Sequence, residues 1–239
     1  MPSRAMDAGD LVLVRGFRDT RATLRDWNDR PWPTIGAWAL GALAVALLLL
    51  CATWAVASLS RPDSTPYSFA GYTSAPRAED VLELLKFNSL VLALHAMACV
   101  AGFIAGSSLP LEAQRYSGTW RWIHDRAGPL AIAFVGAATL FSLSTQAFIL
   151  GSDASTFSHQ LGVSPARLLV GLAPHAIPEL MALFLPLAAW LIASRRGEWS
   201  SLLAATFVTV AIAVPVLVLA SIVEVYLTPH WLSLVAGHA

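Results

Sequence analysis

Five stretches of this chain are each long enough and apolar enough to cross a lipid bilayer. A spanning helix needs about 20 mainly apolar residues. Hydrophobic residues make up 56% of the sequence and charged residues only 13%, which excludes an ordinary soluble domain. We therefore expect an all-α integral membrane protein, a bundle of about five transmembrane helices. The expected spans are Ile35 to Leu59, Phe87 to Leu109, Gly128 to Leu150, Arg167 to Ala193 and Ser200 to Leu227.

The basic residues between these spans predict the orientation of the chain, because positive side chains are retained on the cytoplasmic side. Eleven arginines fall in the N-terminal region, the second loop and the fourth loop, whereas the opposite side holds four basic residues. We therefore expect a cytoplasmic N-terminus and an external C-terminus. On this basis the chain divides into an N-terminal region, residues 1–34, and a polytopic membrane domain, residues 35–239.

The N-terminal region has the pattern of an amphipathic helix. Leu13, Phe17, Leu24 and Trp27 lie near one face of that helix, and arginines and aspartates lie on the other. A helix on the lipid surface is the simplest interpretation, and docking of a cytoplasmic partner is the alternative. The lipid bilayer is thus an expected partner, whereas the net charge of zero gives no indication of nucleic acid binding.

Several polar side chains fall inside the expected spans, where an ionisable group costs about 3 kcal/mol on insertion scales. The expected directions of the spans place all of them between the midplane and the outer surface. Such residues normally face the interior of a bundle and have a partner. This polar intramembrane cluster comprises Asn88, His95, Gln146, His175, Glu179 and Glu224.

The fourth span contains the run VGLAPHAIPELMALFLP, in which His175 and Glu179 lie one turn apart on the same helix face. Pro174, Pro178 and Pro186 each lack an N–H and leave a carbonyl without its helical partner. We therefore expect a proline-broken fourth span. Irregular backbone at this depth is tolerated only in the protein interior or beside water, so the sequence predicts a polar pocket here.

Several chemical roles for this pocket stay open. A hydrogen-bonded network that only fixes helix packing is one of them. A proton-exchanging pair of His175 and Glu179, used in hydrolysis or proton-coupled transport, is another. A zinc site could draw on His175, Glu179, Glu224 and His95, but there is no HExxH motif. Binding of a substrate or lipid completes the alternatives, and from the sequence we expect no cofactor and no metal.

Small residues at four-residue spacing occur in the second span: Ala98, Gly102 and Gly106. Such a strip lets another helix approach closely. Packing inside the bundle is the first interpretation, and a homo-oligomer contact is the second.

The run APHAIPELMA resembles the signature of the stage II sporulation protein M family of bacterial membrane proteins, through Pro174, His175, Glu179, Leu180 and Ala182. The later run SIVEVYLTP is similar to the closing motif of that family, through Glu224, Thr228 and Pro229. Asn88 and Gly151 also lie where the family has an asparagine and a glycine. The chain departs from the pattern at Ala176, Met181, Gln146 and Ala147.

The resemblance covers roughly Phe87 to Pro229 and implies a multi-pass protein of the bacterial cytoplasmic membrane without enzymatic activity of its own. It also implies membrane or envelope protein partners, because the namesake organises peptidoglycan-degrading proteins. We therefore expect a scaffold for envelope remodelling. The alternative is a transporter or intramembrane enzyme that uses the pocket around His175 and Glu179.

Overall fold

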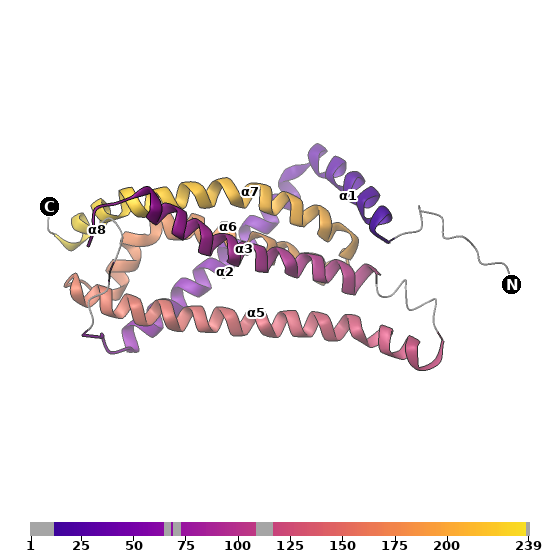
Figure 1. The fold of residues 1–239 in the computed structure, drawn as a ribbon, viewed down its shortest axis with the longest axis horizontal. Coiled ribbons are helices and arrows are strands. Elements are labelled where there is room, and N and C mark those ends of the chain that lie inside the picture. The colour runs from indigo at the N-terminus through magenta and orange to yellow at the C-terminus, as the bar shows by residue number, and fades with distance from the viewer. Residues whose placement is uncertain (1–11, 65–67, 69–72, 109–116, 238–239) are drawn as a thin grey trace.

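The computed structural model describes residues 12–64, 68, 73–108 and 117–237, which form an elongated helical bundle (Figure 1). Within these described residues, five helical segments are long and apolar enough to cross a membrane, which indicates a multi-pass membrane protein and confirms the expected all-α class. They comprise α2 (Pro31–Leu59), α3 (Ala78–Phe103), α5 (Gly118–Gln160), α6 (Pro165–Arg196) and a last segment of α7 (Leu202–Ile222), η4 (Val223–Leu227) and α8 (Thr228–Ala236).

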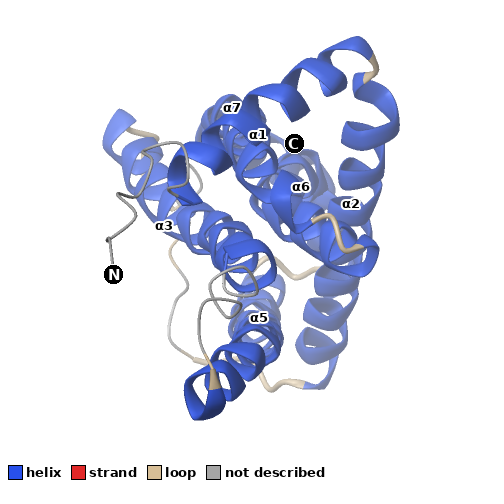
Figure 2. Cartoon of the chain, turned by 90° about the vertical axis from the view of Figure 1, so that its right-hand side faces the viewer, coloured by secondary structure: helices blue, strands red, loops and turns tan. Residues whose placement is uncertain are grey.

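Helix α6 lies at the centre of the bundle (Figure 2). It packs against α2, α3 and α7, while α5 packs mainly against α2 at the edge. Every residue from Ala182 to Trp190 is buried, including Phe184, which has no exposed surface. A helix that is apolar on all sides belongs in the interior, so the sequence of this stretch accounts for its central position.

At three glycines a neighbouring helix or turn packs so closely that there is no room for a side chain. A Cβ on Gly102 would lie 2.8 Å from the indole of Trp190, and one on Gly106 would clash with the indole of Trp199. Gly106 belongs to the π-helical turn η2 (Ile104–Ser108), and Trp199 begins the 3₁₀ turn η3 (Trp199–Ser201). On α5, a Cβ on Gly151 would lie 2.5 Å from Val56 Cβ of α2. The strip of Gly102, Gly106 and the buried Ala98 thus packs inside the bundle.

The expectation of a proline-broken fourth span is wrong, because α6 is a single continuous helix from Pro165 to Arg196. Pro174, Pro178 and Pro186 all lie within it. Each proline removes one hydrogen bond and leaves the bonds on either side in place, and neighbouring helices can satisfy freed groups. At Pro186 the helix also packs closely against α3, where Cys99 Sγ donates to the carbonyl of Pro186 itself at 3.1 Å.

Several helices extend beyond the apolar runs. Helix α3 begins at Ala78, where the backbone N–H of Arg77 donates to Asp80 Oδ2 at 2.9 Å. Helix α5 continues past the expected end of its span to Gln160. Ser155 Oγ donates to the carbonyl of Ser60 at 3.1 Å, so the polar end of α5 is tied to the chain that leaves α2. The expected end of the second span, Leu109, lies outside the described residues.

The N-terminal helix α1 (Val12–Asp29) is present, and its described arginines point to solvent. Its Leu24 and Trp27 are half-buried, with the ring of Trp27 at 5.0 Å from that of Trp38 in an edge-on contact. The helix also touches α7 and η3. The apolar face of α1 therefore rests at least partly on the bundle itself. The side chains of Leu13 and Phe17 and the first eleven residues lie outside the described part.

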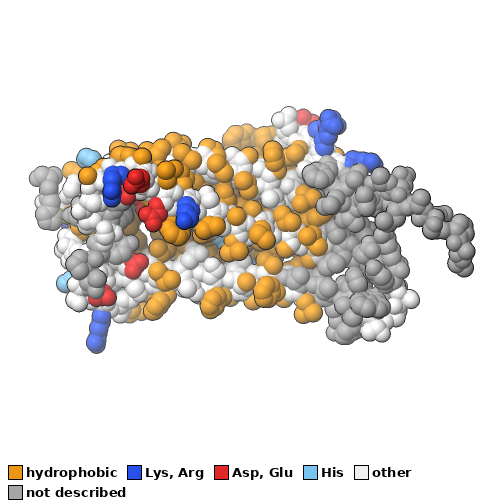
Figure 3. Space-filling model, in the orientation of Figure 1, with side chains coloured by type: hydrophobic (Ala, Val, Ile, Leu, Met, Phe, Trp, Pro, Cys, Tyr) orange, Lys and Arg blue, Asp and Glu red, His pale blue; other side chains and the backbone are white. Residues whose placement is uncertain are grey.

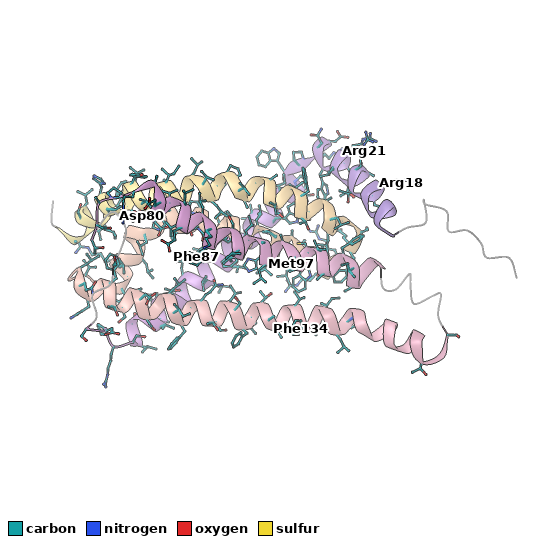
Figure 4. All side chains as sticks on the ribbon, in the orientation of Figure 1. Arg18, Arg21, Asp80, Phe87, Met97 and Phe134 are labelled. Atoms are coloured by element: carbon teal, nitrogen blue, oxygen red, sulfur yellow. The ribbon has the colours of Figure 1, made fainter. Side chains whose placement is uncertain are left out.

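Apolar side chains cover the outside of the bundle along its middle, and charged ones gather towards its ends (Figure 3). Phe87 and Met97 on α3 and Phe134 on α5 point away from the bundle (Figure 4), with exposed fractions of 56%, 67% and 74%. A surface of this kind is stable against lipid tails rather than water. The arrangement agrees with a membrane-embedded bundle.

Candidate functional site

A chamber of about 310 Å³ lies among α2, α3, α5, α6 and η4. Most of its wall is leucine, alanine and phenylalanine, and a few polar groups converge on it. Small-molecule sites have this composition, an apolar enclosure with a few placed polar groups. The polar and ionisable residues of the wall are Thr53, Asp153, His175, Glu179 and Glu224.

Thr228 holds the ring of His175 in place. His175 is 6% exposed, and its Nδ1 lies 2.8 Å from Thr228 Oγ1 at the start of α8. The Thr228 hydroxyl is also within 3.2 Å of the carbonyl of Val223, to which it can donate. In the tautomer with the proton on Nδ1, the ring donates to Oγ1 and Nε2 keeps a free lone pair.

Glu179 lies one turn further along α6 and is held from α3. Asn88 Nδ2 donates a hydrogen bond to Glu179 Oε1 at 2.7 Å. An amide donor to a carboxylate is a charge-assisted bond and fixes the orientation of the acid. One oxygen of Glu179 is thus engaged, and the other remains able to bind a ligand in the chamber.

Glu224 brings a second carboxylate to the same point from η4. One ligand atom each from His175, Glu179 and Glu224 all lie within 4.8 Å of one another. Glu224 has no hydrogen bond or ion pair with any residue that the structure describes. Two carboxylates this close repel each other when both are ionised. A proton or a cation between them would remove this repulsion.

The ionisable groups of the chamber wall are three acids and one histidine, and no lysine or arginine lies among the lining residues of the described chain. Asp153 contributes the third carboxylate from α5. Because like charges in a low-dielectric setting attract an opposite charge strongly, the chamber suits a cation and disfavours an anion.

Thr53 is a buried polar residue of the chamber wall. It is 3% exposed, and its Oγ1 has no hydrogen-bond partner among the described residues. A buried hydroxyl without a partner costs about 1–3 kcal/mol.

The structure brings together four members of the predicted polar cluster: Asn88, His175, Glu179 and Glu224. His95 lies elsewhere, with its ring edge-on against Phe184 at 5.4 Å and its Nδ1 without a hydrogen-bond partner among the described residues. Gln146 Nε2 donates to Ser142 Oγ at 3.3 Å within its own helix. Neither His95 nor Gln146 lines the chamber.

Sequence reasoning missed Asp153 and Thr53. Asp153 falls just after Leu150, the expected end of the third span, although α5 continues past it. Its polar surroundings, GSDASTFSHQ, resemble a loop when the interactions with the end of α2 are unknown. Thr53 carries no signal, because a threonine in an apolar helix usually bonds to its own backbone.

A nitrogen and two carboxylate oxygens converging in a partly apolar chamber can bind a divalent metal ion, exchange protons or hold an organic cation. The chamber provides room for a substrate beside these groups. Comparisons with protein-family models, curated proteins and solved structures find no match to this chain.

Proposed function

We propose that the chain is a multi-pass protein that binds a small cationic ligand in the chamber between α2, α3, α5, α6 and η4, for transport or catalysis. One observation carries this proposal: the chamber is lined by Asp153, His175, Glu179 and Glu224, with no lysine or arginine among its described lining residues. A hydrogen-bonded network that only fixes helix packing would not require a cavity of this size. Packed helix interfaces are usually filled, with few voids larger than a water molecule.

The proposal extends to a protein of the stage II sporulation protein M type in the bacterial cytoplasmic membrane. Its support is the convergence of the residues that carry the resemblance, which come from three separate segments of the sequence. Asn88 bonds to Glu179, Thr228 bonds to His175, and Glu224 meets both of the α6 side chains. Residues that only repeated a packing pattern would have no reason to meet at one polar point.

Ligand binding is tested by the thermal stability of the purified chain in detergent, with a panel of divalent metal ions, monovalent ions and organic amines. A ligand that binds only the folded state stabilises it by RT ln(1 + [L]/Kd), about 2.7 kcal/mol at a hundredfold excess over Kd. We expect at least one cation to raise the melting temperature of the wild type, and anions to have no such effect.

The matched variants are Glu179→Gln in the chamber and Glu83→Gln on the exposed face of α3. The shift should disappear in the first and persist in the second. If no cation stabilises the wild type more than the folded Glu179→Gln protein, the chamber does not serve as a cation site.

A second function, the organisation of envelope partners, is favoured by α5. Only 6% of its apolar window is buried in the bundle, and Phe134 and Phe141 are 74% and 75% exposed. A long helix with so few buried residues offers a face to another transmembrane helix. Photo-crosslinking from position 141 in cells should then give a discrete protein adduct, and position 207 on α7, also exposed, serves as the control.

A further inference from the structure

We infer that the cation of the chamber is a divalent transition-metal ion of the Zn²⁺ class, bound by His175 Nε2 and one carboxylate oxygen each from Glu179 and Glu224. This inference rests on the proposed cation site and names its ligand. It revises the expectation from the sequence that no metal is bound.

The distances allow coordination with small side-chain movements. In a tetrahedral site with bonds of about 2.1 Å, ligand atoms lie about 3.4 Å apart. The three ligand atoms here lie within 4.8 Å of one another. A contraction of this size needs only side-chain torsions, since the two α6 ligands are already one turn apart on one face.

The surrounding hydrogen bonds have the arrangement that metal sites require. A histidine ligand usually gives its other ring N–H to an oxygen, which fixes the tautomer and the ring orientation. Thr228 Oγ1 lies in this position at His175 Nδ1, and its hydroxyl can donate to the carbonyl of Val223 when it accepts from the ring. The carboxylate of Glu179 is likewise held by Asn88. Both supports leave an atom free to coordinate, Nε2 of His175 and the second oxygen of Glu179.

The chamber leaves room beside the three ligand atoms. Three protein ligands leave a coordination position open, and in zinc enzymes water or substrate occupies it. The chamber of about 310 Å³ is large enough for such a molecule.

The ligand set selects among cations. An imidazole nitrogen suits zinc, cobalt, nickel, iron and copper, whereas calcium and magnesium prefer sites made of oxygen alone. No cysteine takes part, because Cys51 is exposed and Cys99 donates to Pro186. An organic amine would be held by the carboxylates alone, and its binding would not require His175 to present a lone pair.

The test is metal binding by the full chain purified in detergent, with Zn²⁺ and then Co²⁺ as the probes. After chelation and reloading, we expect one tightly bound Zn²⁺ per chain by elemental analysis. Co²⁺ should give the visible absorption of a four- or five-coordinate site with nitrogen and oxygen ligands. His175→Gln, Glu179→Gln and Glu224→Gln should each weaken binding at least a hundredfold.

Exposed residues of the same types provide matched controls: His230→Gln and Glu83→Gln should keep the wild-type affinity. Thr228→Val retains all three ligands and should weaken binding by about 10–100-fold, as loss of a supporting hydrogen bond does. This variant, together with the wild-type Co²⁺ spectrum, keeps the test decisive if a ligand variant fails to fold.

Absence of stoichiometric metal from the wild type, or binding that survives in all three folded ligand variants, would overturn the inference. If organic amines stabilise the wild type and metals do not, the cation site stands and the metal assignment fails. If metals bind with equal affinity to wild type and to Glu179→Gln, then the chamber is not the site and the proposed function fails with the inference.

Discussion

Thr228 Oγ1 lies 2.8 Å from His175 Nδ1, a contact that joins the start of α8 to the first third of α6 across 53 residues of sequence. Both side chains are buried, with Thr228 fully enclosed and His175 6% exposed. In an apolar environment this bond orients the imidazole and stabilises the packing of the last helical segment. The candidate site is therefore coupled directly to the folding of the C-terminal part of the chain.

Replacement of Thr228 by valine should lower the free energy of unfolding by about 1 kcal/mol. Valine keeps the shape of the side chain but removes the acceptor of the His175 N–H, and interhelical bonds in membranes have about this strength. Denaturant unfolding in detergent measures the change. Thr209→Val is the matched control, because Thr209 is also fully buried but bonds only to its own helix. Equal losses in both variants would contradict a special role for the contact between Thr228 and His175.

Phe184→Ala should cost about 3–5 kcal/mol, since this ring has no exposed surface and its loss leaves a cavity at the centre of the bundle. Phe134→Ala on α5 removes a side chain that is 74% exposed, and we expect a change of less than about 0.5 kcal/mol. The same unfolding measurement compares the two. A similar cost for both would mean that α5 has a protein neighbour at Phe134 under the conditions of measurement.

Gly151→Ala should destabilise the chain by about 1–3 kcal/mol through overpacking of α2 against α5. The added Cβ would lie 2.5 Å from Val56 Cβ and 2.9 Å from the carbonyl oxygen of Thr53, and a backbone atom cannot rotate away. Gly136→Ala on the same helix meets nothing within 4 Å and should gain about 0.5–1 kcal/mol from helix propensity. The two melting temperatures should thus move in opposite directions. A Gly151→Ala variant that is more stable than the wild type would show that α2 and α5 lie further apart at residue 151 than in this structure.

The apolar runs predicted the helical class and the approximate position of each span, because length and hydropathy alone decide which segments can cross a bilayer. Helix ends were less predictable. The end of α5 depends on Ser155 and Thr156, whose hydroxyls bond to the chain after α2 at 3.1 and 3.0 Å. Such interactions involve residues 93 and 95 positions apart and leave no local pattern.

The candidate site was predictable where polar residues interrupt apolar runs, as His175, Glu179 and Glu224 do. Which of these residues meet depends on how the helices rotate about their axes. His95 packs against Phe184, and Gln146 forms a hydrogen bond within its own helix, whereas Asp153 lines the chamber. The proline break failed as a prediction because each proline removes only one helical hydrogen bond, and α6 continues through all three of them.

The orientation of the bundle is the last prediction, and it determines which side of the membrane the chamber serves. The end of the bundle that holds the starts of α2 and α7 carries Arg30, Arg195 and Arg196 together with the exposed arginines of α1, whereas Arg61, Arg77, Lys86 and Arg167 are spread over the other end. Positive residues are retained in the cytoplasm. Reporter fusions at Gly118 and at the C-terminus should therefore report cytoplasmic and external locations.

His175 lies about 15 Å along α6 from Pro165 at 1.5 Å per residue, so this result would place the chamber in the outer half of the bilayer. The reverse pattern would place it in the inner half, where its ligand would come from the cytoplasm.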